Sequence, residues 1–209
     1  VQSERDALGH FQILGDHGAE VIKVESFDGD DTRRYGRPVA DGSAPYFLGL
    51  NRNKKNVALD LSVDSGLDTL LSLLSTADVL IENFKMSTWR KWGIDDLSTL
   101  ATKFPNLIHC RISGFGETGQ MGGLPGYDAA IQAMSGLMST NGDPAVKAAR
   151  VGIPLVDAAT GVQAALGVRE NRLDLFASHA REPLKEVVDA GAGFKVLEQS
   201  LDRDSGVLE

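Results

Sequence analysis

The chain has 209 residues, enough to bury the core of one domain or of one domain with an appendage. Its 29 acidic and 21 basic side chains give a formal net charge of -8, which argues against nucleic acid as the main partner. No segment approaches the roughly 20 consecutive apolar residues of a membrane span, so we predict no membrane role. The single cysteine, Cys110, and a first stretch without the apolar core of a secretory signal favour the cytoplasm.

Short runs rich in Val and Ile alternate with helical patterns along the first part of the chain. Gly15 to Gly18 indicates a helix end just before the first run. The predicted strands are 19–25, 56–60, 77–82 and 106–113, and the predicted helices are 65–75 and 94–104. This alternation predicts an α/β fold with a Rossmann-like parallel sheet and flanking helices.

Ligands of such sheets bind beyond the carboxyl ends of the strands, so the residues that follow each strand are candidates for a site. These are Asn83 and Phe84, the loop 114–126 with six glycines, and Asp157, which follows an apolar run that we expect to be another strand. The charged loop 28–37 is a second irregular segment. Long glycine-containing loops in compact domains are usually functional or mobile.

The chain changes character after Val168. From Arg169 onward it is charged, with helical stripes and no run of strand type as strong as the earlier ones. We therefore predict two parts: a Rossmann-like catalytic domain over 1–168 and a helical C-terminal segment over 169–209 that packs back on it.

Several motifs follow one another in a fixed order: GDHGAEVIKVE, GDDTRRYG, NRNKKNVALDL, ADVLIENF, GFGETGQMGGLPGYD and GIPLVDAATG. Together they resemble the family III CoA-transferases, such as formyl-CoA transferase and carnitine CoA-transferase, whose fold the 2-methylacyl-CoA racemases share. The resemblance covers about residues 9–168. It implies coenzyme A as substrate and product with no permanently bound cofactor, an acyl-CoA and a small carboxylic acid as partners, and an interlocked homodimer.

Asp157 carries the chemistry that the resemblance implies. In the family an aspartate at the start of a helix attacks the acyl-CoA thioester, which splits one difficult exchange into easier covalent steps. A helix N-terminus would favour its ionised form, and the small neighbours Ala158, Ala159 and Gly161 leave room for a thioester. From the residues alone, an Asp before an apolar helix is more often an N-cap, and that alternative stays open.

The resemblance also implies a set of CoA-binding residues. An aromatic ring can stack on adenine, and lysines can meet the phosphates of an anionic cofactor. The alternatives are ordinary: a core aromatic, lysines on a solvated face, a loop tyrosine and a helix-capping aspartate. The matched residues are Leu59, Ser62, Asn83, Phe84, Lys85, Lys91, Tyr127 and Asp128.

Two positions bear on the branch of the family. Racemases have histidine at the position of Tyr127, and tyrosine, with a reference pKa near 10, is a poor base, so a transferase is favoured over a racemase. Where the family often has a basic residue after its first motif, this chain has Ser26, for which Arg33, Arg34 or Arg37 could substitute.

Other functions remain or are excluded on the same evidence. The four histidines have no metal-ligand spacing, so we predict no metal site. Because family members are about twice as long, we expect a family member that is either represented here in part or internally shortened, in both cases without the middle domain. A catalytically silent CoA-binding module therefore remains an alternative to an active transferase.

Overall fold

The computed structural model describes residues 11–39, 42–94, 96–142, 145, 147–179 and 195–200. The strands are Glu20–Glu25 (β1), Lys54–Ala58 (β2), Val79–Glu82 (β3), Ile108–Arg111 (β4) and Lys195–Ser200 (β5). The helices are Gln12–Asp16 (α2), Pro45–Asn51 (α3), Asp64–Leu74 (α4), Met86–Lys91 (α5), Ser98–Lys103 (α6), Asp128–Met134 (α7), Leu137–Thr140 (α8) and Leu155–His179 (α9), with a 3-10 turn, η1, at Asp31–Arg34.

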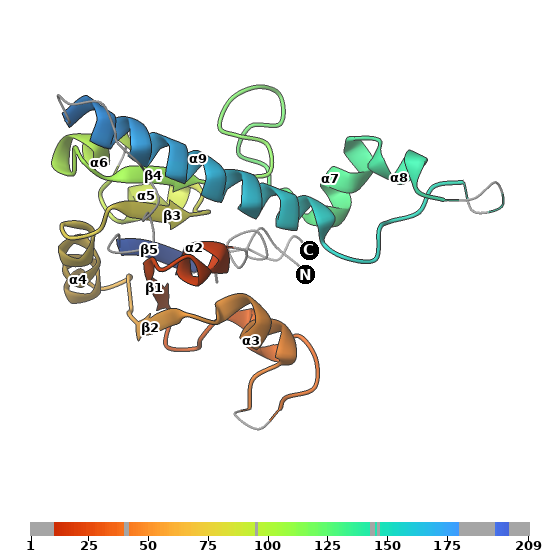
Figure 1. Cartoon of the computed structure of the whole chain (residues 1–209), viewed down its shortest axis with the longest axis horizontal. Helices are drawn as coiled ribbons and strands as arrows, with labels where there is room; N and C mark the ends of the chain where they lie inside the picture. The colour runs from red at the N-terminus through yellow and green to blue at the C-terminus, as the bar shows by residue number, and fades with distance from the viewer. Residues whose placement is uncertain are drawn as a thin grey trace.

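The strands form one five-stranded sheet in the order β2-β1-β5-β3-β4 (Figure 1). Every pairing in this sheet is parallel, as expected where helices connect successive strands. The predicted α/β fold with a Rossmann-like parallel sheet is confirmed.

Helices cover both faces of the sheet, and each face has its own apolar core. On one face α2 and α9 contribute Leu14, Ala165 and Val168, which pack with residues of the strands. On the other face the core comes from α4, α5 and α6 together with alternate strand residues, and its members include Leu70, Leu74, Leu80, Trp89 and Leu100. Successive side chains of a strand point to opposite faces, so β1 is buried almost throughout.

Two expectations about the later chain are wrong. The run 151–156 is not a strand, because helix α9 already begins at Leu155, directly after a proline that has no N–H for a sheet. Residues 195–200, expected within a helical segment, form β5 at the centre of the sheet. Because α9 continues to His179, the predicted division between 168 and 169 falls inside one helix.

Helix α9 runs along the sheet, and α7 and α8 lie beyond its N-terminal end (Figure 1). Among the described residues, no helix combines the length and the apolar character needed to cross a bilayer. The beginning of α9, where α7 meets it, is the region that holds Asp157.

Candidate active site

Asp157 is the third residue of α9 and is buried, with 6% of its surface exposed. It heads a stripe of buried residues at helical spacing, Asp157, Gly161, Ala165 and Val168, that faces the sheet. The C-terminal part of this stripe, Ala165 and Val168, packs in the core with residues of β1 and β3. The residues beside Asp157 on α9 line a pocket together with Ser113, which follows β4, so Asp157 lies near the carboxyl end of the sheet.

Asp157 is not the N-cap of its helix. The N–H groups of Val156 and Asp157 point to Oδ2 of Asp128, at 2.9 and 3.5 Å, and the N–H of Ala158 donates to the carbonyl of Pro154. Asp128 therefore supplies the acceptor that an N-cap side chain normally supplies, from a position far away in the sequence. The capping alternative raised for Asp157 does not describe its placement.

The predicted CoA residues around β3 fall into two groups. Phe84 is 4% exposed and packs edge-on against Trp89 and Trp92, so the core alternative describes the placement of its ring. Lys85 and Lys91 are exposed at the two ends of helix α5, and Asn83 is half-buried between β3 and that helix. Both lysines thus lie on the surface at the same helix.

A buried ion network holds the backbone of this turn, a feature that sequence reasoning missed. Glu82, which is fully buried, accepts a hydrogen bond from the N–H of Phe84, and its Oε1 lies 2.9 Å from His109 Nε2 and 3.4 Å from Arg111 Nε. Arg111 Nη2 donates to the carbonyl of Phe84 at 2.6 Å. Both backbone polar groups of Phe84 are therefore bonded to charged side chains at the ends of β3 and β4.

Leu59 and Ser62 follow β2 at the same edge of the sheet. Leu59 is half-buried and packs against the apolar core of the α4 face, whereas Ser62 is exposed and donates from its N–H and Oγ to Asp60. Two strands, β1 and β5, separate β2 from β3. At a strand spacing of about 4.8 Å the two predicted CoA segments therefore lie about 14 Å apart along the edge, a span that requires an extended ligand.

Tyr127 and Asp128 begin helix α7. Tyr127 is half-buried at the N-cap position, whereas Asp128 is 1% exposed. Both carboxylate oxygens of Asp128 bond to other parts of the chain, including Gln132, Arg150 and the start of α9. Gln132 is a further residue that sequence reasoning missed, although its spacing of four from Asp128 on a helix was a usable signal.

The basic residues proposed to replace Ser26 are not equivalent. The guanidinium of Arg33 bonds both carboxylate oxygens of the buried Glu25 and lies 3.8 Å from the centre of the Phe47 ring. Arg34 and Arg37 are exposed on the loop that follows β1. Of the three, only these two therefore present a surface cation there.

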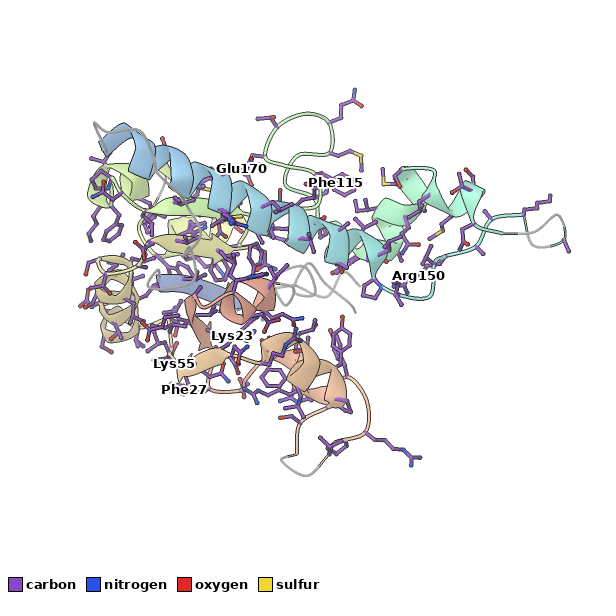
Figure 2. The ribbon with its side chains drawn as sticks, viewed as in Figure 1. Lys23, Phe27, Lys55, Phe115, Arg150 and Glu170 are labelled. Atoms are coloured by element: carbon purple, nitrogen blue, oxygen red, sulfur yellow. The ribbon has the colours of Figure 1, made fainter. Side chains whose placement is uncertain are left out.

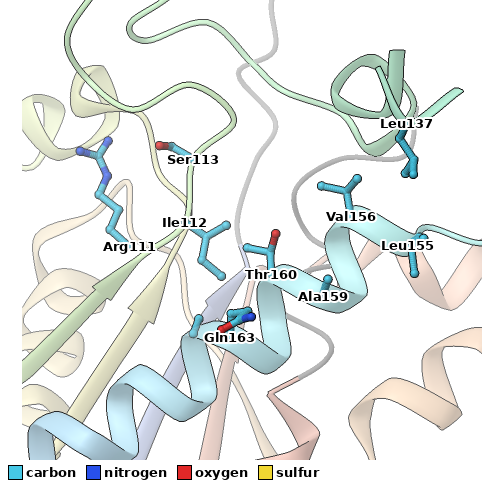
Figure 3. A pocket seen from close by; sticks show the side chains of 10 residues that line it. Arg111, Ile112, Ser113, Leu137, Leu155, Val156, Ala159, Thr160 and Gln163 are labelled. Atoms are coloured by element: carbon cyan, nitrogen blue, oxygen red, sulfur yellow. The ribbon is translucent and has the colours of Figure 1, made fainter. Parts of the chain in front are cut away.

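A pocket of about 750 Å³ lies on the flank of α9, and it includes Ser113, Thr160 and Gln163 among its polar lining (Figure 3). Figure 3 shows the end of β4, the first turns of α9 and Leu137 of α8 around this space. Asp157 is not among the lining residues, because its side chain turns toward the sheet.

Two further observations concern the cysteine thiol and clusters of metal-ligating side chains within the described chain. Burial and the charge of Glu82 raise the pKa of the Cys110 thiol to about 11, so its thiolate is scarce near neutral pH. Among the residues that the structure describes, no group of three or more His, Cys, Asp or Glu side chains could hold a metal ion.

The fold and the site define a Rossmann-like protein with a buried aspartate at the start of a helix beside the carboxyl end of its sheet. The sequence model of CoA-transferase family III matches residues 9–175. The chain belongs to this family, as the motifs had indicated.

Named relatives agree with this assignment. A succinate–glutarate CoA-transferase of Agrobacterium fabrum is 43% identical over 158 residues, which are 72% of this chain and 39% of the relative. A human succinyl-CoA:glutarate CoA-transferase is 40% identical, with 72% of this chain and 34% of the relative covered. An acetyl-CoA:oxalate CoA-transferase of Acetobacter aceti is 42% identical, with 67% of this chain and 36% of the relative covered.

Solved structures are also similar. A CAIB/BAIF family protein from Brucella suis superposes with a TM-score of 0.76 and 35% identity, covering 85% of this chain and 47% of that one. A hypothetical protein from Mycobacterium tuberculosis, Rv3272, superposes with a TM-score of 0.72 and 30% identity, covering 95% of this chain and 51% of that one. The chain thus spans about half the length of these structures and less than half of the named relatives.

Proposed function

We propose that the chain carries the CoA-binding edge and the nucleophile of an enzyme that transfers coenzyme A from an acyl-CoA to a carboxylic acid. The observation that carries this proposal is the placement of Asp157, a buried carboxylate in the first turn of α9 in a member of CoA-transferase family III. The names of relatives that exchange CoA between succinate, glutarate or oxalate support small dicarboxylic acids as the first substrates to test.

The proposed reaction begins when a carboxylate oxygen of Asp157 attacks the thioester carbonyl. A C–O bond forms, the C–S bond breaks, and the products are an aspartyl-acyl mixed anhydride and CoA thiolate. The thiolate then attacks the aspartyl carbonyl of the anhydride, which releases the donor acid and leaves an aspartyl-CoA thioester.

The acceptor acid completes the exchange. Its carboxylate attacks the aspartyl-CoA thioester, which forms a second anhydride and again frees CoA thiolate. The thiolate attacks the acyl carbon of the acceptor, so the new acyl-CoA leaves and Asp157 is regenerated as a carboxylate. No proton, electron or phosphate is consumed, because every step exchanges one acyl bond for another.

The CoA-binding part of the proposal rests on two surface features. Lys85 and Lys91 are exposed at the ends of α5, next to the Glu82–Phe84 turn, where they can meet the phosphates of CoA. Leu59 and Ser62 lie further along the same edge and suit another part of an extended ligand. We also propose, from the family resemblance and the single cysteine, a homodimeric protein of the cytoplasm, and sedimentation would test the dimer.

The test is to incubate the purified chain with succinyl-CoA and to trap aspartyl intermediates with hydroxylamine. A hydroxamate at Asp157, located by tandem mass spectrometry and absent in Asp157→Ala, is the expected result. Titration calorimetry with CoA runs in parallel, and Asp157→Ala should bind CoA within about three-fold of the unchanged chain, since a loss of the nucleophile removes transition-state contacts.

The other outcomes identify the alternatives. CoA binding without a hydroxamate at Asp157 would contradict the transferase and favour a silent CoA-binding module. Exchange of an alpha proton of a 2-methylacyl-CoA with deuterated solvent would favour a racemase.

A further inference from the structure

We propose that Asp128 and Gln132 form a clamp that positions Asp157, so that Asp128 acts on the nucleophile and does not contact CoA. This inference rests on the proposed function, because the proposed function is what assigns Asp157 as the nucleophile. The clamp is defined here as the side chains of Asp128 and Gln132 on α7 together with the segment 150–157 that they hold.

Both carboxylate oxygens of Asp128 accept hydrogen bonds, and three of the four donors lie 22 to 29 residues away in the sequence. Its Oδ2 accepts from the N–H of Val156 at 2.9 Å and from that of Asp157 at 3.5 Å. Its Oδ1 accepts from Gln132 Nε2 at 2.5 Å and from Arg150 Nη2 at 3.3 Å. The two N–H groups belong to the first turn of α9, whose donors have no partner within the helix.

Gln132 holds the other end of the same segment. Its Oε1 accepts from the N–H of Val151 at 2.9 Å, and its Nε2 lies 3.4 Å from the carbonyl of Ile153. Gln132 is fully buried and lies one helical turn after Asp128. One face of α7 therefore bonds the segment before α9 at its beginning and at its end.

Residues 150–154 of this segment need such external support because they belong to no helix or strand, whereas residues 155–157 already lie in α9. These residues lie outside the sheet, and Arg150, the first of them, lies below α7 in the view of Figure 2. Ile153 is 59% exposed, so apolar burial contributes little there. The bonds to α7 therefore fix the first turn of α9, and with it the backbone of Asp157, relative to α7.

Burial separates this role from CoA binding. Only 1% of the surface of Asp128 is exposed, and its negative charge would disfavour a phosphate. The charge is instead offset by Arg150 and by the positive end of α9. A positioning role therefore accounts for the hydrogen bonds of Asp128 to α7, to Arg150 and to the start of α9, whereas binding of CoA by Asp128 would account for none of them.

The experiment compares Asp128→Ala and Asp128→Asn with the unchanged chain. The first readout is amide hydrogen exchange of the peptide that spans 151–165, which does not depend on activity. The second is the rate of hydroxamate formation at Asp157 with saturating succinyl-CoA, and the third is the CoA dissociation constant. Asp96→Ala is the matched control, because Asp96 also accepts an N–H at a helix start, that of Ser98, but is exposed and lies beside α6.

We expect faster exchange at 151–165 in Asp128→Ala, with exchange in β1 and β3 unchanged. The rate of hydroxamate formation should fall on the order of 100-fold, as expected for a displaced reacting group, while the CoA dissociation constant changes less than about three-fold. Asp128→Asn keeps one oxygen for Val156 and should retain more of the rate. Asp96→Ala should change none of the three readouts.

Three results would overturn the inference. Unchanged exchange at 151–165 in both variants would show that no clamp exists. Faster exchange with an unchanged rate would show that the clamp does not position Asp157, and weaker CoA binding with an unchanged rate would return Asp128 to the CoA site. If the unchanged chain forms no hydroxamate, the proposed function fails by itself, and exchange alone then decides whether the clamp exists.

Discussion

The ion pair between Lys23 and Asp30 provides a quantitative test of the structure. Lys23 lies in β1 (Figure 2), and 2% of its surface is exposed. Its Nζ lies 2.5 Å from Oδ2 of Asp30. Asp30 also accepts from the N–H and Oγ1 of Thr32 at the start of η1. Burial by itself would raise the pKa of Asp30, but the charge and hydrogen bonds of Lys23, together with those of Thr32, lower it from 3.8 to about 2.

The perturbation is Asp30→Asn, which removes the charge and keeps a side chain that can cap η1. The lowered pKa, 3.8 against about 2, corresponds to about 2 kcal/mol, since each pKa unit is worth about 1.4 kcal/mol. Removing one partner of a buried pair costs about 3 to 5 kcal/mol. We therefore expect Asp30→Asn to lower the free energy of unfolding at pH 7 by about 2 to 4 kcal/mol.

The pH dependence has a defined sign. Because the folded-state pKa of Asp30 lies below its unfolded-state value, the stabilisation is present above about pH 4 and is lost as the pH falls toward 2. The difference in unfolding free energy between the unchanged chain and Asp30→Asn should therefore shrink over this range. At low pH the protonated carboxyl of Asp30 is uncharged, and so is the amide in Asp30→Asn. Lys23 then faces an uncharged group at position 30 in both chains.

Urea denaturation at a series of pH values from 7 to 2.5 measures both effects. Asp31→Asn is the control, since Asp31 is adjacent, its side chain is 49% exposed, and its pair with Arg34 spans 3.9 Å. Exposed pairs contribute about 0 to 1 kcal/mol, so this variant should change little. A loss as small in Asp30→Asn as in Asp31→Asn, or a difference that does not shrink toward pH 2.5, would refute the reasoning.

Two further predictions concern packing. Val196→Asp should lower the free energy of unfolding, measured by urea denaturation, by about 3 kcal/mol or more, because a carboxylate would replace a fully buried side chain at the centre of the sheet. The control is Val63→Asp, at a site that is 47% exposed, where the cost should be small. Equal losses in the two variants would contradict the central position of β5. Gly66→Ala should lower the melting temperature, because the added Cβ would lie 1.8 Å from the carbonyl oxygen of Asp60. In the control, Gly49→Ala, the added Cβ meets nothing within 4 Å, so this variant should be neutral or stabilising. An unchanged melting temperature in Gly66→Ala would show that α4 does not approach residue 60 so closely.

Local pattern was sufficient for most of the parallel sheet. The strands 20–25, 79–82 and 108–111 and the helix 64–74 lie within two residues of the predicted ranges, because alternation and helical spacing are properties of adjacent residues. The sequence also singled out Asp157 as either a cap or a nucleophile, since a carboxylate beside apolar residues needs a reason. Family membership came from the order of the motifs and agreed with the match over residues 9–175.

Tertiary structure decided which residues meet. Residues 195–200 were predicted to be helical, but they form a strand between β1 and β3. In this position the backbone groups on both sides of the strand have hydrogen-bond partners. Phe84 entered the core because two tryptophans pack against it, which no local pattern shows.

The start of α9 shows the same division most clearly. The sequence by itself identified Asp157 and its small neighbours, because these are consecutive residues. The acceptor for its N–H group is Asp128, 29 positions earlier, and only folding brings the two together. Hydrogen bonds act over about 3 Å of space whatever the separation along the chain, so the candidate nucleophile was visible in the sequence while the residues that hold it were not.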